Sequence, residues 1–128
     1  MKLLYPDLST KIYDGIFAVH RALGPGLLES AYEICLKKEF EDLGLSVECQ
    51  KPVPLIYKGI TLDAGYRVDM MIEQKIVVEL KAVENIFPVH RAQLLTYLRL
   101  TNCKLGFLIN FNVELVKNGI ERIVLEKG

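Results

Sequence analysis

The chain has 128 residues, of which 51% are hydrophobic and 25% are charged, with 16 basic and 16 acidic side chains. This is the composition of one globular domain with a real core, so we expect residues 1–128 to form a single domain. A formal net charge of zero argues against a polycation that coats nucleic acid, although a local basic groove is compatible with it. No apolar run approaches the roughly 20 residues of a membrane span, and the N-terminus lacks an apolar signal core. We therefore expect a cytoplasmic protein with no membrane partner.

The three cysteines, Cys35, Cys49 and Cys103, stand far apart in the sequence. No Cys-x-x-Cys pair or Cys/His cluster accompanies them, so the sequence does not indicate a zinc site. Reduced and mostly buried thiols are the simplest expectation.

The first predicted element is a helix over about residues 8–22, where apolar residues recur at intervals of three or four. Asp7 follows a proline and is a candidate for its N-terminal cap. The segment Leu23-Gly-Pro-Gly26 interrupts the pattern, because glycine and proline both break helices.

The second predicted element is a helix from about Leu28 to Leu43, with Gly44 as a suitable C-terminal stop. We expect its inner side to carry Ala31, Ile34, Cys35, Lys38 and Leu43.

A strand-rich block follows the two helices. Residues 47–57 contain two prolines, which predicts an edge strand or an irregular one, and residues 57–60 predict a turn. Residues 62–72 and 76–83 predict a hairpin of two strands. In the second strand, alternate residues form one apolar face made of Ile76, Val78, Leu80 and Ala82, and an opposite face made of Val77, Glu79 and Lys81.

The hairpin brings charged residues together. If residues 73–75 form its turn, Ile72 faces Ile76 and Asp69 faces Glu79. Directly opposite residues project to the same side of a sheet, where like charges are destabilising. Lys81 lies two residues beyond Glu79 and shares its side. A divalent cation would relieve the repulsion between the two carboxylates.

The last third of the chain completes an α/β pattern. A proline opens a predicted helix over residues 88–101, where its missing N–H matters least. Residues 105–110 predict a short buried strand. Residues 113–116 and 120–125 predict a closing hairpin around the tight turn 117–119, which contains Asn-Gly. The order of elements predicts a mixed sheet with helices on its faces.

Three sequence motifs resemble those of known nucleases. Asp69 followed by Glu79-Leu80-Lys81 on a neighbouring strand resembles the PD-(D/E)XK nuclease superfamily, although Arg-Val rather than a proline precedes the Asp. Gln93 and Tyr97 resemble the Gln-x-x-x-Tyr element of its exonuclease-like branch and share one helix face. The segment Gly26-Leu-Leu-Glu29-Ser-Ala-Tyr32 resembles the signature of the GxxExxY protein family, which is assigned to the same superfamily. The resemblance covers the chain from about residue 8 to its end.

This resemblance implies a restriction-endonuclease-like fold and a metal-dependent nuclease that hydrolyses nucleic acid by a metal-activated water. Glu29, Asp69 and Glu79 would face a shared Mg2+ or Mn2+, with the backbone carbonyl of Leu80 as a further ligand. Lys81 would hold the attacking water and help to deprotonate it, while the metal polarises a phosphodiester oxygen.

Substrate-binding roles follow from the same resemblance. Gln93 and Tyr97 would orient the metal site or contact the substrate backbone, unless they are only the polar margin of an amphipathic helix. Tyr32 is either a substrate contact or a core aromatic on the same helix face as Glu29.

The residues also have simpler interpretations. Asp69, Glu79 and Lys81 on an exposed strand would form a salt bridge worth roughly 0–1 kcal/mol. Glu29 in the first turn of a helix is favoured by the helix dipole alone.

Other polar residues near the motifs carry weaker expectations. His20 and His90 are expected to be solvated or to cap helices. Glu84 and Asn85 follow the lysine strand and are candidates to line the mouth of the site.

The leading hypothesis is therefore a nuclease-like phosphodiesterase, with DNA and RNA both open as substrates. A nuclease fold that binds nucleic acid or protein without turnover is the alternative, and a regulatory or defence-associated partner protein is a third. A homodimer is compatible with so small a domain, because a second subunit would help it to grip a long substrate.

Overall fold

The computed structural model describes residues 4–62 and 65–126. Helix α1 spans Pro6–Leu23, α2 spans Glu29–Asp42 and α3 spans Pro88–Thr101, close to the predicted ranges. No helix in these ranges is long and apolar enough to cross a membrane. The remaining elements are β1 (Val47–Pro52), β2 (Leu55–Tyr57), β3 (Ile60–Leu62), β4 (Arg67–Ile72), β5 (Ile76–Lys81), β6 (Leu105–Asn110), the 3-10 helix η1 (Val116–Gly119) and β7 (Ile120–Val124).

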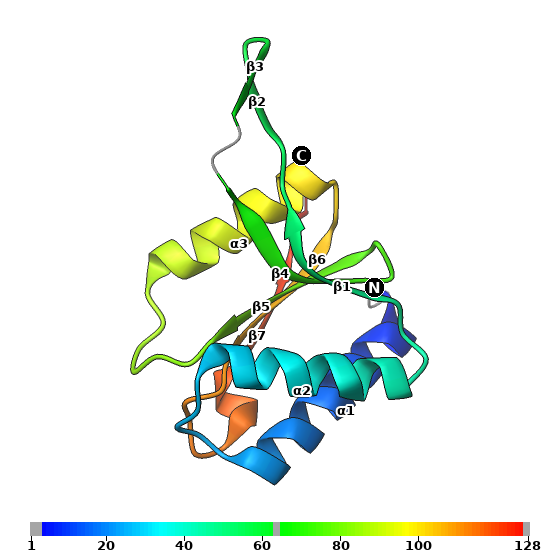
Figure 1. Cartoon of the computed structure of the whole chain (residues 1–128), viewed down its shortest axis with the longest axis vertical. Coiled ribbons are helices and arrows are strands. Elements are labelled where there is room, and N and C mark those ends of the chain that lie inside the picture. Colours follow the sequence, from blue (N-terminus) through cyan, green and yellow to red (C-terminus); the bar gives the residue numbers. More distant parts are fainter. Residues whose placement is uncertain (1–3, 63–64, 127–128) are drawn as a thin grey trace.

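The centre of the fold is a five-stranded mixed sheet with the strand order β1-β4-β5-β6-β7. Strands β5 and β6 are parallel and are connected through α3, whereas the other neighbours are antiparallel. Strands β2 and β3 form a separate ribbon that projects from the body, at the top of Figure 1. The predicted mixed α/β sheet flanked by helices is confirmed.

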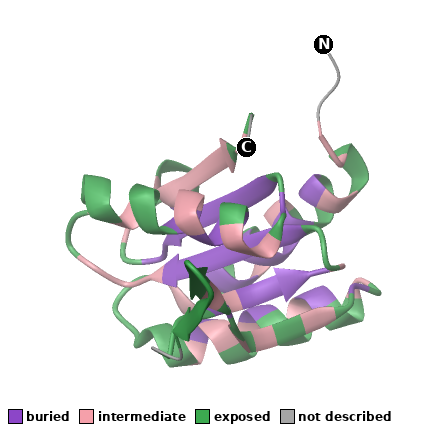
Figure 2. Ribbon diagram, turned by 90° about the horizontal axis from the view of Figure 1, so that it is seen from above, coloured by how far each residue is buried: buried purple, intermediate pink, exposed green. Residues whose placement is uncertain are grey.

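Helices cover both faces of the sheet. Helices α1 and α2 lie on one face and α3 on the other, so the sheet separates two apolar cores (Figure 1). The central strands β4, β5 and β6 are mostly buried, the edge strands β1 and β7 are partly exposed, and most exposed residues lie on the helices, the loops and the ribbon (Figure 2). Ile76, Val78 and Leu80 face α1 and α2, whereas Val77 faces α3, which confirms the predicted alternation of β5.

The predicted N-terminal cap of the first helix is wrong. The cap position is Tyr5, whose backbone is left-handed (φ 49), and Asp7 lies inside the first turn of α1. Pro6 accounts for this start, because it has no N–H to be capped and its fixed φ suits the first helical position.

The predicted inner face of the second helix is also wrong. The buried residues of α2 are Tyr32, Leu36 and Phe40, whereas Ile34 is 70% exposed. The reason is tertiary: the ring of Phe40 packs against Gly15 of α1, where an added Cβ would lie 2.6 Å from a ring carbon. Packing of Phe40 on this glycine sets the rotation of α2 against α1.

The strand-rich block agrees with the prediction in part. Strand β1 is an edge strand and pairs with β4, as its prolines indicate. The turn at residues 57–60 is present, with positive φ at Lys58 and Gly59. The predicted strand 62–72 is interrupted: β3 ends at Leu62, residues 63–64 lie outside the described ranges, and β4 begins at Arg67.

The predicted closing hairpin is half wrong. Strand β7 forms and pairs with β6, but residues 113–116 are not a strand. The Asn-Gly pair lies in η1 instead of a hairpin turn. A side chain at Gly119 would collide with the backbone carbonyl of Asn110, so this close approach of η1 to the end of β6 requires a glycine.

Candidate functional site

The predicted site lies on the hairpin of β4 and β5. Its backbone ladder has three residue pairs and begins, as predicted, at the pair Ile72 and Ile76. The next two residues that face each other, Asp69 and Glu79, are not part of the ladder. The hairpin therefore has a closed half near its turn and an open half that carries the acids.

Carboxylates replace the backbone ladder in the open half. The Asp69 N–H donates a hydrogen bond to Glu79 Oε2 (2.7 Å), and the Leu80 N–H donates to Asp69 Oδ2 (2.8 Å). Each side chain thus reaches across to the backbone of the other strand, so both carboxylates lie where the strands part. Acceptance of a backbone N–H favours the charged form of each acid.

The two acids do not form a regular cross-strand pair, which corrects the predicted geometry. Val68 packs in the core under α3, but Met70, two residues later, packs in the core under α1 and α2. A regular strand would place both on one face. The alternation of β4 is therefore broken at Asp69, the residue between them.

Asp69 opens onto a cavity of about 320 Å³ between α2 and the sheet. Its lining combines five acidic or polar residues and one apolar residue from two helical turns and three strands: Glu29, Ser30, Glu33, Gln50, Asp69 and Leu80. Glu33 and Gln50 were missed by the sequence analysis. Glu33 lies four residues after Glu29 and so shares its helix face, which is a signal that the sequence contains. The position of Gln50 depends on strand pairing and has no such signal.

Burial dominates the electrostatics of the acid pair. Glu79 is only 5% exposed, and burial together with the charge of Asp69 raises its pKa to about 8. Burial also raises the pKa of Asp69, against the opposing effects of the Leu80 N–H, the Lys81 charge and Gln50. Lys81 is half-buried and forms no salt bridge with any described residue. The surface salt bridge of the simpler interpretation is absent from the described chain.

A second pair of acids, Glu33 and Asp69, lies beside the pair formed by Asp69 and Glu79. Gln50 Nε2 donates to Glu33 Oε1 (2.7 Å) and approaches Asp69 Oδ1 at 3.5 Å. Burial raises the pKa of Glu33, and the charges of Asp69 and Glu29 add to this against the Gln50 hydrogen bond. The cavity is therefore lined by carboxylates that repel one another.

The donor chemistry fits a hard divalent cation only in part. The acidic side chains that line the cavity, Glu29, Glu33 and Asp69, offer oxygen atoms, which Mg2+ and Mn2+ prefer as ligands. However, across residues 4–62 and 65–126 no group of three or more acidic, His or Cys side chains gathers closely enough to hold a metal ion. Glu29 is exposed at the start of α2. The described structure therefore does not gather Glu29, Asp69 and Glu79 into such a group; of the three, Glu29 and Asp69 line this cavity and Glu79 does not.

Gln93 and Tyr97 lie next to each other on α3, as their spacing predicts. Gln93 Nε2 donates to the Tyr97 hydroxyl (3.2 Å). Tyr97 is 5% exposed, and its pKa is raised by burial and then by the charges of Glu79 and Asp69. Tyr97 is therefore within electrostatic range of both acids, and Gln93 is exposed beside it.

Tyr32 has a structural position, which corrects its expected contact with substrate. The side chain is fully buried and stacks on Phe111, with ring centroids 4.4 Å apart. Its hydroxyl donates to the Gly24 carbonyl (2.5 Å) and accepts from the Leu27 N–H (3.2 Å). Tyr32 thus fixes the loop that leads into α2, and the described structure leaves it no surface for a ligand.

The remaining polar residues lie away from the acid pair. His90 Nδ1 accepts from the Phe87 N–H (3.0 Å) and so caps α3, as expected. Glu84 and Asn85 line a different cavity, beside Arg91. Their expected place at the mouth of the site is therefore wrong, because the chain turns towards α3 after β5.

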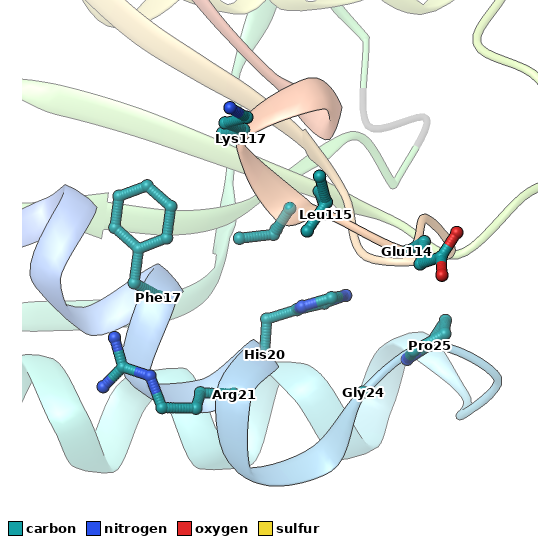
Figure 3. Close-up of a pocket in the computed structure, with 9 residues that line it drawn as sticks. Phe17, His20, Arg21, Gly24, Pro25, Glu114, Leu115 and Lys117 are labelled. Carbon is teal, nitrogen blue, oxygen red and sulfur yellow. The ribbon is translucent and has the colours of Figure 1, made fainter.

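His20 is buried rather than solvated, which corrects its expected environment. Its Nε2 lies 2.8 Å from the carbonyl oxygen of Val113. It lines a cavity of about 410 Å³ between the end of α1 and residues 114–117, shown in Figure 3. None of the predicted site residues lines this cavity.

A mixed sheet flanked by helices, with a buried and a half-buried carboxylate and a lysine at an opened hairpin, defines a nuclease-like α/β domain. A family profile described as the PD-(D/E)XK nuclease superfamily matches residues 6–123. The chain belongs to this superfamily, and its fold is consistent with the PD-(D/E)XK fold. Membership suggests a nuclease-like function and a nucleic-acid substrate. The chain has no significant match among curated proteins or among solved structures.

Proposed function

We propose that this protein is a metal-dependent phosphodiesterase that hydrolyses nucleic acid at the open half of the β4–β5 hairpin. The observation that carries the proposal is the crossed arrangement of Asp69 and Glu79, each bonded to the backbone of the other strand. Glu79 is buried and Asp69 is half-buried, and the pKa values of both are raised; acids in such environments cost folding free energy and cluster at functional sites.

The chain supplies oxygen donors, a cation and a polar margin. Asp69 and Glu79, together with the carbonyl of Leu80, are the groups proposed to hold Mg2+ or Mn2+. When bound, such an ion would neutralise charge on a phosphodiester and lower the pKa of water. Glu29, at the margin of the cavity, is proposed to act on water around the site rather than as one of three clustered ligands.

Lys81 is proposed to orient the attacking water and to offset negative charge on the phosphate. Its side chain is half-buried and forms no salt bridge within the described residues, so its ammonium group has no competing partner there. Gln93 is proposed to contact the substrate backbone from α3, while Tyr97 holds Gln93 through its hydroxyl.

We further propose that the chain belongs to the GxxExxY group within the superfamily. The segment from Gly26 to Tyr32 supports this, since it combines the cavity acid Glu29 with a tyrosine that fixes the preceding loop. In this proposal the motif places a carboxylate beside Asp69 and holds it there through the packing of Tyr32.

A binding module without turnover is the second candidate. One observation favours it: no group of three potential ligands gathers within the described ranges. In that case nucleic acid would bind irrespective of divalent cations and of the two hairpin acids.

Cleavage assays with Mn2+ or Mg2+ test the proposal on single-stranded and double-stranded DNA and RNA. We expect cleavage of at least one substrate, and a loss of about 100-fold or more for Asp69→Asn and Lys81→Met. Asp14→Asn, an exposed acid on α1, is the matched control and should cleave like the parent protein.

Cleavage that persists unchanged in Asp69→Asn and Lys81→Met would refute the proposed mechanism. Calorimetry with Mn2+, with and without nucleic acid, separates the second candidate. Nucleic-acid binding that is insensitive to metal and to both substitutions would favour the binding module.

A further inference from the structure

The backbone of Gln50 is unusual for a strand. Its φ is 52, in the left-handed region, although it lies in the middle of β1. The other described residues with positive φ that are not glycine lie at helix ends or in turns: Tyr5, Lys58, Glu73, Gln74 and Asn102. A left-handed residue with a side chain costs free energy and persists where the surrounding structure imposes it.

The irregularity faces Asp69. The β1–β4 ladder includes the pairs Cys49–Met70 and Lys51–Val68, and the intervening position, where Gln50 meets Asp69, is not a ladder pair. The face alternation of β4 breaks at the same position. The two strands are therefore distorted together at one point, which is the point where the site begins.

The Gln50 side chain lies between two acids. Its amide donates to Glu33 Oε1 at 2.7 Å and approaches Asp69 Oδ1 at 3.5 Å. The second oxygen of Asp69 accepts the Leu80 N–H, so one carboxylate is held from both sides. A neutral donor at this place reduces the repulsion between Glu33 and Asp69 without adding a charge.

We propose that Gln50 is a positioning residue: its left-handed backbone and its amide together hold the Asp69 carboxylate against the Leu80 N–H and towards the cavity. The catalytic consequence rests on the proposed function, but the positioning of Asp69 does not. In this proposal Gln50 acts through Asp69.

Three substitutions test this inference. Gln50→Gly accepts the left-handed backbone but removes the amide. Gln50→Asn also tolerates that backbone and keeps a shorter amide. Glu48→Gly is the matched control, because it places a glycine at an exposed position of β1 with regular pairing.

The first readout is the NMR signal and hydrogen exchange of the Leu80 amide, which reports on the Asp69 carboxylate without any assay of activity. In Gln50→Gly we expect the signal to move and its exchange to quicken, while the urea midpoint stays equal or rises. In Glu48→Gly we expect a lower midpoint and an unchanged Leu80 signal. A merely structural role of Gln50 would lower the midpoint without moving this signal.

The second readout is steady-state cleavage. In Gln50→Gly we expect kcat to fall about 10- to 100-fold with a nearly unchanged KM, as for a misplaced catalytic group. Gln50→Asn should lie closer to the parent protein in kcat and in the Leu80 signal.

An unchanged Leu80 amide in Gln50→Gly would overturn the inference, as would a Gln50→Asn variant no closer to the parent than Gln50→Gly. If the parent protein cleaves nothing, the proposed function fails, and the Leu80 amide alone still decides whether Gln50 positions Asp69.

Discussion

The two halves of the β4–β5 hairpin use the same backbone for different purposes. In the closed half, which runs from the turn to the pair Met70 and Val78, the backbone ladder is complete and the apolar side chains are buried. In the open half, Asp69 and Glu79 take over the role of backbone acceptors. Only a few residues separate a region that stabilises the fold from one that holds a buried and a half-buried acid.

This difference shows how a sheet displays charge without losing its strands. Because each acid accepts a backbone N–H of the neighbouring strand, the opened hairpin leaves few unpaired donors, and an unpaired buried donor costs about 1–3 kcal/mol. In the open half, the hydrogen bonds that Asp69 and Glu79 accept from backbone N–H groups therefore offset part of the cost of their burial and of their mutual repulsion. The following predictions test this difference between the two halves of the hairpin.

The largest effect is expected from Lys81→Met in the open half. Removal of the ammonium group should lower the rate of cleavage by about 10²- to 10⁴-fold, because Lys81 is the proposed orienting group for water. The free energy of unfolding should fall by only about 1 kcal/mol, because Lys81 makes no salt bridge within the described residues and its half-buried charge favours the ionised acids only from a distance. Cleavage assays and urea unfolding measure the two quantities.

Lys104→Met, an exposed lysine before β6, is the control for this prediction. Equal losses of activity in both variants would show that Lys81 has no special place at the site.

In the closed half, Ile76→Ala should show the opposite signature. Ile76 is fully buried, so the substitution should lower the free energy of unfolding by about 2–5 kcal/mol. The kcat of the folded fraction should stay near that of the parent protein. Urea unfolding measures the loss, and Ile34→Ala, at a 70% exposed position, is the control with little expected effect. A small loss at Ile76 would contradict the tight packing of this half.

The pH dependence of stability should report the open half directly. The pKa of Glu79 is raised from its ordinary value of 4.5 to about 8, so the folded protein binds more protons than the unfolded chain between these values. The free energy of unfolding should therefore fall as the pH rises through this window, with a slope of at most about 1.4 kcal/mol per pH unit. Urea unfolding from pH 4 to 9 in the absence of divalent cations measures it.

Glu79→Gln should flatten this profile, because the amide does not titrate. A parent protein whose stability is independent of pH across the window would show that the carboxyl is not buried as described. Mn2+ affinity should rise over the same window, since a bound cation favours the ionised carboxyl.

The smallest effect is expected at the turn of the closed half. Gln74 has a positive φ of 56, which glycine adopts without strain. Gln74→Gly should change the free energy of unfolding by less than about 1 kcal/mol, because relief of the left-handed backbone is offset by the lost side-chain hydrogen bonds with Lys51 and Glu48 and by the greater freedom of glycine in the unfolded chain. Cleavage should not change, because the turn lies at the far end of the hairpin from the acids. A change in activity would mean that the two halves are coupled.

Much of this difference can be predicted from the sequence, because the hairpin depends on local sequence patterns. The polar turn at residues 73–75 and the alternation along β5 follow from strand periodicity. Periodicity also brings Asp69 and Glu79 to the same end of the hairpin, but it does not predict their crossed hydrogen bonds to the backbone. The helix ranges follow from apolar spacing and from glycine and proline breaks. These features are decided by residues that are close in sequence.

The errors come from tertiary contacts. The buried face of α2 is decided by Phe40 against Gly15, and the geometry of Asp69 is decided by Gln50 on an edge strand. The exposure of Glu29 and the absence of a three-ligand cluster in the described ranges depend on how far α2 stands from the sheet. No local pattern encodes these distances.

The Tyr32 side chain links the start of α2 to the sheet. Its hydroxyl holds the Gly24 and Leu27 backbone, and its ring lies flat on Phe111, which directly follows β6. The loop, the first turn of α2 and the end of β6 should therefore open together as one cooperative unit in native-state hydrogen exchange. Glu29 would then hold a fixed position relative to the sheet while that unit is closed, and this position would be lost in a single step when the unit opens.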